Sequence, residues 1–201
     1  SKLSYGYGRY SFNFSLGLFG HEIVSCCNLD FPGRIVLADD PTRGDVAVFK
    51  LPTDTNIDYI KRVIGLPGDR VAVSGGQVVL NGARVPRTAG ADVLVPISDN
   101  TGCTWGGDAE RAADGSEVCR YKAFRETLPN GRSYTVLDFG RTPADDYAEQ
   151  TVPAGTLFVM GDNRDSSLDS RFPASAGEGV GFVSQDLLVG RASVFVWSTD
   201  G

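Results

Sequence analysis

Several residue types that build common functional sites are scarce in this chain of 201 residues. The single histidine, His21, excludes most histidine-based metal sites and makes any Ser-His-Asp triad depend on one residue. We expect His21 to be structural or on the surface, and we expect no metal and no cofactor. Lysine is also rare, with 4 lysines against 15 arginines, so a buried, reactive lysine would stand out.

Long apolar runs and an excess of positive charge are absent as well. No segment approaches the roughly 18 apolar residues of a membrane-spanning helix, and no signal peptide begins the sequence. The net charge of -6 argues against nucleic acid as a partner, because a surface that follows phosphates needs clustered Lys and Arg. Since the chain starts at Ser1 without methionine, we expect it to be a fragment of a longer protein.

The four cysteines do not form the C-x-x-C motif of metal or redox sites. A disulfide between Cys103 and Cys119 would close a loop of a size at which a bridge is stabilising, provided that the compartment is oxidising. We therefore treat Cys103 and Cys119 as disulfide candidates. Cys26 and Cys27 are adjacent, and we expect no bridge between them because a vicinal disulfide strains the backbone.

Apolar residues alternate with a period of two along much of the chain, which predicts a mostly β fold. The alternation is strictest from Tyr10 to Leu18, whose aromatic face we assign to the core, with a partner or bilayer surface as the alternative. Further strands are predicted at 34–38, 45–50, 59–64, 70–74, 77–80, 156–160 and 191–197. Asn81-Gly82 predicts a type I′ turn, and Ser184 is a candidate cap for a short helical turn that ends at Leu188.

Residues 88–150 differ from the rest of the chain. They are rich in Gly, Ala, Asp and Arg and have weaker periodicity, which predicts an inserted, smaller domain with long loops. Residues 1–87 and 151–201 then form a single discontinuous β domain.

The most polar stretch runs from Gly161 to Arg171 and reads Gly-Asp-Asn-Arg-Asp-Ser-Ser-Leu-Asp-Ser-Arg. Such residues also make ordinary surface turns, so the stretch is either a solvated loop or the brace of a site. A calcium loop is disfavoured, because Arg164 occupies a position that needs an oxygen ligand.

Lys61 is the candidate reactive lysine. In a strand over residues 59–64 it shares a face with Tyr59 and Val63, and burial there disfavours the ammonium form. This would lower the lysine pKa from about 10.4 toward about 7 to 8, where a neutral amine can act as a general base. The alternative is an ordinary lysine whose amine reaches water at a sheet edge.

The polar loop contains partners that such an amine would need. Ser167 or Asp169 could orient the amine by hydrogen bonding, while Arg62 and Arg171 hold the carboxylates in place.

Two long segments resemble signature boxes of the bacterial type I signal peptidases. They are Asp58-Tyr-Ile-Lys-Arg-Val-Ile-Gly-Leu-Pro-Gly-Asp69 and the stretch from Gly161 to Arg171. Supporting similarity lies in Arg43–Lys50, Val152–Met160, Gly181-Phe-Val and Val189-Gly-Arg191. The resemblance thus covers nearly all of the chain outside residues 88–150.

This resemblance implies a membrane-anchored Ser/Lys endopeptidase with a mostly antiparallel, barrel-like β fold. Members of the family remove N-terminal signal peptides from exported preproteins after an Ala-x-Ala sequence, on the outer, periplasmic side of the cytoplasmic membrane. The implied partners are signal peptides and the membrane surface, with no nucleic acid. Residues 88–150 coincide with a variable non-catalytic insertion, which carries a disulfide in some members.

Carried over by position, the resemblance assigns a role to each candidate site residue. Lys61 corresponds to the general base and Ser167 to the hydroxyl that orients it. Asp169, Arg171 and Arg62 correspond to the bracing ion pairs. Cleft positions whose small pockets would select alanine correspond to Val48, Asp58, Tyr59 and Ile60.

One departure from the family pattern is large. The nucleophilic serine of the family lies in a Ser-x-Met-x-Pro-Thr box, upstream of a stretch that resembles Lys2 to Gly6, and these 201 residues contain no such box. A backbone N–H of the oxyanion hole would be missing with it. We therefore expect the 201 residues to form an inactive fragment of the catalytic domain.

Two other interpretations stay open. One is a different Ser/Lys protein of the same fold, either a conjugation-type maturation peptidase or a self-cleaving repressor, although the repressor should carry a DNA-binding domain. The other is a non-catalytic module that holds a peptide with the surface of residues 10–18 and the insertion at 88–150.

Overall fold

The computed structural model describes residues 40–97, 102–103, 106–175 and 179–192, together with the backbone of two strands, β1 (Phe14–Leu18) and β2 (His21–Cys26). β1 and β2 form an antiparallel pair. The strand predicted from Tyr10 is thus found over its second half, while residues 10–13 and the predicted strand at 34–38 lie outside the described residues. The expectations for the side chains of His21, Cys26 and Cys27 also lie outside them.

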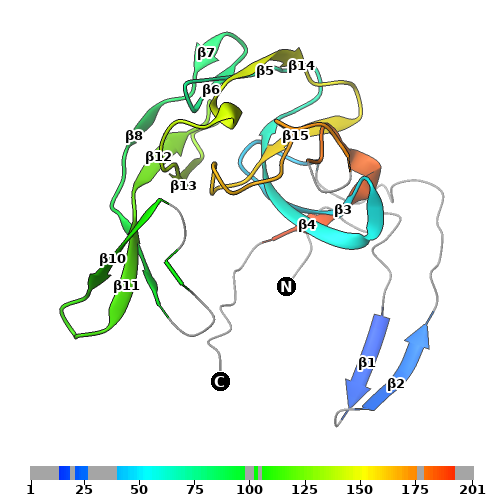
Figure 1. Cartoon of the computed structure of the whole chain (residues 1–201). Coiled ribbons are helices and arrows are strands. Elements are labelled where there is room, and N and C mark those ends of the chain that lie inside the picture. Colours follow the sequence, from blue (N-terminus) through cyan, green and yellow to red (C-terminus); the bar gives the residue numbers. More distant parts are fainter. Residues whose placement is uncertain are drawn as a thin grey trace.

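The fold is mostly antiparallel β, as predicted, and every pair of named strands is antiparallel (Figure 1). Within the described residues the strands form separate sheets rather than one barrel-like sheet. The largest has the order β16-β15-β4-β3-β17. Its strands are β3 (Val46–Leu51), β4 (Asp54–Gly65), β15 (Thr156–Met160), β16 (Val183–Ser184) and β17 (Leu188–Arg191).

The central strands of this sheet are covered on both faces. Ile64 of β4 packs with Phe158 and Met160 of β15 in one core cluster, whereas Val63 packs with Val159 in another. Successive side chains of a strand point to opposite faces, so the two strands supply apolar side chains to both clusters. This two-sided burial explains why residues 157–160 form a continuous apolar run.

A second sheet, of order β14-β5-β6-β7, follows from local sequence signals. Its strands are β5 (Arg70–Ser74), β6 (Gln77–Leu80), β7 (Ala83–Arg84) and β14 (Tyr147–Thr151). Asn81 and Gly82 have φ angles of 54° and 83°, as the predicted type I′ turn requires. β6 pairs with β7 across this turn, so the predicted turn is confirmed, and Gly75 and Gly76, which also have positive φ, join β5 to β6.

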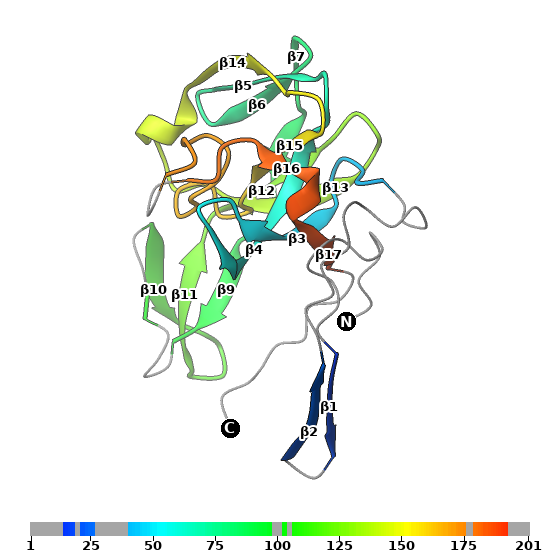
Figure 2. The same ribbon diagram turned by 90° about the vertical axis from the view of Figure 1, so that its right-hand side faces the viewer.

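Residues 88–150 contain more strand than their weak periodicity predicted. One sheet has the order β13-β12-β8 and another the order β10-β11-β9. The bounds are β8 (Arg87–Ala89), β9 (Val93–Pro96), β10 (Gly107–Arg111), β11 (Glu117–Tyr121), β12 (Ala123–Thr127) and β13 (Ser133–Leu137), with a 3-10 helix, η1, at Pro143–Asp145. Both views show β9–β11 lying away from β5, β6 and β14 (Figure 2).

The two sheets of this region relate differently to the rest of the chain. Leu128, Tyr134 and Val136 belong to the same core cluster as Ile64 and Phe158. β12 and β13 therefore build part of the common core, while β9–β11 form a projecting unit. The division into residues 1–87 with 151–201 and an insertion at 88–150 remains a prediction.

The end of the described chain agrees with the predicted cap. The 3-10 helix η2 (Gln185–Leu187) begins after Ser184, whose side chain accepts a hydrogen bond from Asp186 N at 3.3 Å. The strand predicted at 191–197 begins earlier, since β17 starts at Leu188. Residues 193–197 lie outside the described part of the chain.

Candidate active site

Lys61 lies on β4, at the edge of a cleft of about 230 Å³. Its Cα pairs with that of Ala47 on β3, and β15 flanks β4 on the other side. The loop from Gly161 follows β15 directly, which explains how the two polar segments of the sequence meet. The cleft is lined by Val46, Ile60, Lys61, Arg62, Gly161, Asp162, Asn163, Ser166 and Ser167.

Burial lowers the pKa of Lys61 below its ordinary value. The negative charge of Asp169 acts against this shift, the positive charge of Arg171 adds to it, and the charge of Asp162 again opposes it. The ammonium nitrogen lies 5.5 Å from the centroid of the Tyr59 ring, on the face that alternation predicted. The neutral amine form is therefore reached at a lower pH at Lys61 than at a solvated lysine.

Ser167 lies in the same cleft and is packed against the backbone of Gly161. Its Oγ is buried and has no hydrogen-bond partner among the described residues, so the expected hydrogen bond to Lys61 is not formed in this structure. A Cβ placed on Gly161 would lie 2.2 Å from Ser167 Oγ, so only glycine leaves room for this packing. A buried hydroxyl without a hydrogen-bond partner costs free energy. A ligand atom that hydrogen-bonds to Ser167 Oγ would remove this cost.

Asp169 and Arg171 form a buried ion pair within the loop. Arg171 Nε donates to Asp169 Oδ1 at 2.9 Å and Arg171 Nη2 donates to Oδ2 at 2.9 Å. Gly161 N also donates to Asp169 Oδ2, at 3.0 Å. Asp169 therefore ties the start of the loop to its end.

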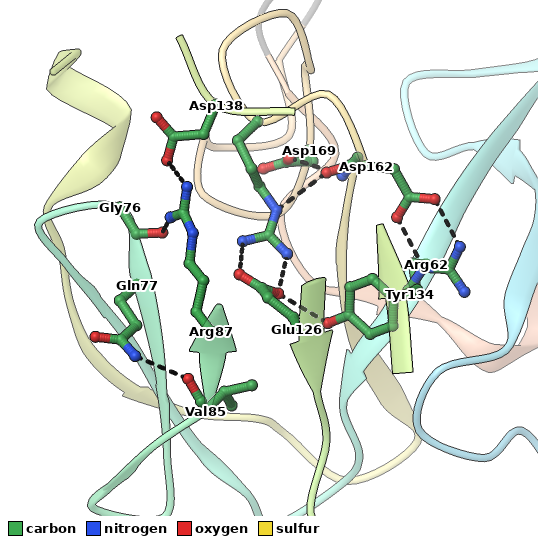
Figure 3. Close-up of polar contacts among 12 residues, drawn as sticks. Arg62, Gly76, Gln77, Val85, Arg87, Glu126, Tyr134, Asp138, Asp162 and Asp169 are labelled. Atoms are coloured by element: carbon green, nitrogen blue, oxygen red, sulfur yellow. Dashed lines mark hydrogen bonds and ion pairs between the residues drawn. The ribbon is translucent and has the colours of Figure 1, made fainter. Parts of the chain in front are cut away.

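Arg62 braces the same loop from β4. It donates to Asp162 from Nε at 2.7 Å and from Nη2 at 2.6 Å, and its Nη1 donates to Gly44 O at 2.8 Å (Figure 3). The guanidinium carbon also lies 4.3 Å from the centroid of the Tyr134 ring. Sequence reasoning named Arg62 as a brace, and the structure supplies Asp162 as its partner.

A third ion pair was missed by sequence reasoning. Arg164 donates to Glu126 from Nη1 at 2.8 Å and from Nη2 at 2.5 Å, and Tyr134 Oη donates to Glu126 Oε2 at 3.0 Å. Both charged side chains are almost fully buried. The available signal was weak: Glu126 shares the inward face of its segment with Leu128, inside a region that had been assigned to an insertion.

The predicted substrate-binding residues are only partly gathered at the cleft. Ile60 lines it and is 49% exposed, while Val48 lies directly across the sheet from Ile60. Asp58 forms an ion pair with Lys50 at 2.9 Å, and the ring of Tyr59 packs 6.3 Å from that of Phe49. The role of Val48, Asp58, Tyr59 and Ile60 in binding therefore stays a prediction.

Cys103 and Cys119 are joined by a disulfide, with their Cα atoms 5.2 Å apart. The bridge connects β11 to the segment that follows β9. Over the described ranges, no cluster of three or more His, Cys, Asp or Glu side chains is placed to hold a metal. No helix in those ranges is long and apolar enough to cross a membrane.

Comparison with known proteins identifies the family. Residues 2–197 match the family described as signal peptidase, peptidase S26. The chain is 34% identical to a signal peptidase I of Rickettsia prowazekii over 98% of its length and 35% identical to that of Rickettsia felis. It spans 63% and 62% of the length of these two relatives.

A solved structure, a signal peptidase I from Enterococcus faecalis V583, shares 24% identity with this chain. It matches with a TM-score of 0.40 and covers 77% of this chain and 98% of its own. The S26 match extends from Lys2 to Trp197 and contains both polar segments that meet at the cleft. The chain therefore belongs to the signal peptidase family, peptidase S26.

Proposed function

We propose that this chain is the catalytic part of an enzyme that removes N-terminal signal peptides from exported preproteins. The observation that carries the proposal is the half-buried Lys61, whose pKa is lowered in a cleft that it shares with Ser167. Family membership supports the same reading. In the proposed reaction the substrate is cut after an Ala-x-Ala sequence, on the outer side of the cytoplasmic membrane.

Lys61 acts as the general base in this proposal. Its neutral amine accepts the proton of a serine hydroxyl as that hydroxyl attacks the scissile carbonyl carbon, and the resulting ammonium then donates the proton to the leaving amine. The charges of Asp169 and Asp162 favour the ammonium form. They therefore stabilise Lys61 at the moment when it carries the proton, while burial favours the neutral amine before the reaction.

Ser167 serves as the hydroxyl that orients the amine. Its Oγ has no hydrogen-bond partner among the described residues and can therefore bind the amine, and the pairs Asp169–Arg171 and Arg62–Asp162 brace the loop that carries it. The nucleophile in this proposal is a serine outside the 201 residues, since the chain contains no Ser-x-Met-x-Pro-Thr box. The 201 residues alone are then inactive.

The test compares the full-length protein, the 201-residue chain and one variant of each on a peptide that contains an Ala-x-Ala site, with products identified by mass spectrometry. The full-length protein is expected to cut after the second alanine, and Lys61→Arg should abolish the cut because a guanidinium stays charged and cannot accept the proton. The 201-residue chain is expected to leave the peptide intact. Cleavage by the short chain that is lost in Ser167→Ala would make Ser167 the nucleophile and overturn the role assigned to it.

A further inference from the structure

A second cavity lies beside the candidate active site and is dominated by arginine. It has a volume of about 440 Å³ and is lined by Gly44, Asp45, Val46, Arg62, Arg132, Arg191 and Ala192. We call this cavity the arginine pocket. Three of the described residues that line it are cationic and one is a carboxylate, so its lining attracts anions.

The arginines are held in place by a buried acid. Asp45, which is 2% exposed, accepts a hydrogen bond from Arg132 Nη1 and a longer one, of 3.4 Å, from Arg191 Nη1. Its other oxygen accepts from Thr42 N at 2.9 Å and from Thr42 Oγ1 at 3.0 Å. A single carboxylate thus orients two guanidinium groups and neutralises one of their two charges.

The two guanidinium groups keep donors for a further ligand. Each carries five N–H bonds in a planar fork, which suits carboxylate and phosphate oxygens. The Arg132 side chain is 44% exposed and that of Arg191 is 32% exposed. Both therefore combine a fixed orientation with access from solvent.

The arginine pocket and the catalytic cleft are neighbours, because Val46 and Arg62 line both. Along β4, Lys61 lies between the exposed apolar Ile60 and the cationic Arg62. A general base acts at the bond that is cut, so substrate residues on either side of that bond lie on either side of Lys61. The small apolar substrate residues that precede the cleaved bond fit the part of the cleft near Ile60. The arginine pocket then faces the substrate residues that follow the cleaved bond.

From this placement we propose that the arginine pocket is a subsite for an acidic side chain, Asp or Glu, among the first few residues after the cleaved bond. The inference rests on the proposed function and adds a substrate preference to it. Because charge-assisted hydrogen bonds to arginine are strong and specific, the enzyme should favour acidic over basic substrates at one position.

The experiment uses the full-length protein and peptides with the same Ala-x-Ala site. Glu, Gln or Lys is placed in turn at each of the first few positions after the cut, and kcat/KM is measured. At one position the Glu peptide should exceed the Lys peptide by about tenfold or more, and the ratio should fall as salt screens the charges. In Arg132→Glu and Arg191→Glu the ratio should fall below one.

The ratio compares two peptides on one preparation, so partial unfolding of a variant does not change it. Arg111→Glu is the matched control, since that side chain is 71% exposed on β10, in a different sheet, and it should keep the wild-type ratio. Equal cleavage of the Glu and Lys peptides at every position would contradict the acidic subsite but not the proposed function. If the protein cleaved none of the peptides, both proposals would be wrong.

Vesicles of phosphatidylglycerol separate a substrate carboxylate from a lipid phosphate. If Arg132→Gln and Arg191→Gln weaken vesicle binding while the Glu to Lys ratio stays at the wild-type value, the pocket binds lipid headgroups and the inference is wrong. If the ratio changes and vesicle binding does not, the acidic subsite is supported.

Discussion

Gly161 and Ser167 are packed so closely that a Cβ at position 161 would meet Ser167 Cβ at 2.4 Å. Position 161, the first of the polar loop, therefore has to be glycine because the side chain of Ser167, the seventh, occupies the space of a Cβ. Neither composition nor strand alternation indicates this contact, because it arises only when the loop folds back over its own start.

Gly161→Ala should displace Ser167 from the cleft. The added methyl group cannot share the space of the serine side chain, and a shift of about 1 Å at a catalytic site can cost roughly 100-fold in rate. We expect kcat/KM of the full-length protein on an Ala-x-Ala peptide to fall at least about tenfold. Gly102→Ala is the control, since a Cβ at that position would meet nothing within 4 Å; wild-type activity in Gly161→Ala would show that Ser167 is dispensable.

The pH dependence of cleavage should report Lys61. A general base is active when unprotonated, so kcat/KM rises with pH through the lysine pKa, and a lowered pKa moves that rise toward acid pH. Asp162 favours the ammonium form, so Asp162→Asn should lower the pKa further and shift the acidic limb to lower pH. A full pH profile of both proteins measures this shift, and a limb displaced toward higher pH would contradict it.

Asp169→Ala should destabilise the chain strongly. It leaves Arg171 buried without its carboxylate, and breaking a buried ion pair in this way costs roughly 3 to 5 kcal/mol. Urea unfolding of the 201-residue chain measures the loss. The matched control is Glu117→Ala, whose pair with Arg111 is exposed and whose loss should change the free energy of unfolding by less than about 0.5 kcal/mol. Equal losses in the two variants would mean that the Asp169 pair adds little.

The disulfide predicts a simple thiol count. With Cys103 and Cys119 bridged, alkylation of the oxidised chain without reduction should leave these two residues unmodified, and reduction should expose both. Peptide mapping by mass spectrometry locates the modified residues. Alkylation of Cys103 and Cys119 in protein prepared under oxidising conditions would contradict the bridge.

The predictions that succeeded depend on residues close together in the sequence. The turn at Asn81-Gly82 needs two residues with positive φ, and those two residue types adopt it readily. Residues 157–160 are apolar throughout, and β15 spans the predicted strand at 156–160. Lys61 was placed on the face of Tyr59 by alternation alone, and the structure finds its amine near that ring.

The region 88–150 shows why other features escaped prediction. Some of its strands pair with distant segments, as β14 does with β5. The position of these partner strands determines which face of each strand is buried. Glu126 illustrates the difficulty, since a glutamate in a strand normally predicts a solvent-exposed face. It is buried here because Arg164 and the Tyr134 hydroxyl satisfy its oxygens.

The sequence by itself determined the β class, the local turns and the two polar segments that identify the candidate site. Only the tertiary structure decided which charges meet: Arg62 pairs with Asp162, 100 residues away, and Arg132 with Asp45, 87 residues away. The physical reason is that a turn or a strand face depends on neighbouring backbone angles and side-chain alternation. An ion pair between distant residues depends on the order and register in which the strands assemble, and no short stretch of sequence specifies these.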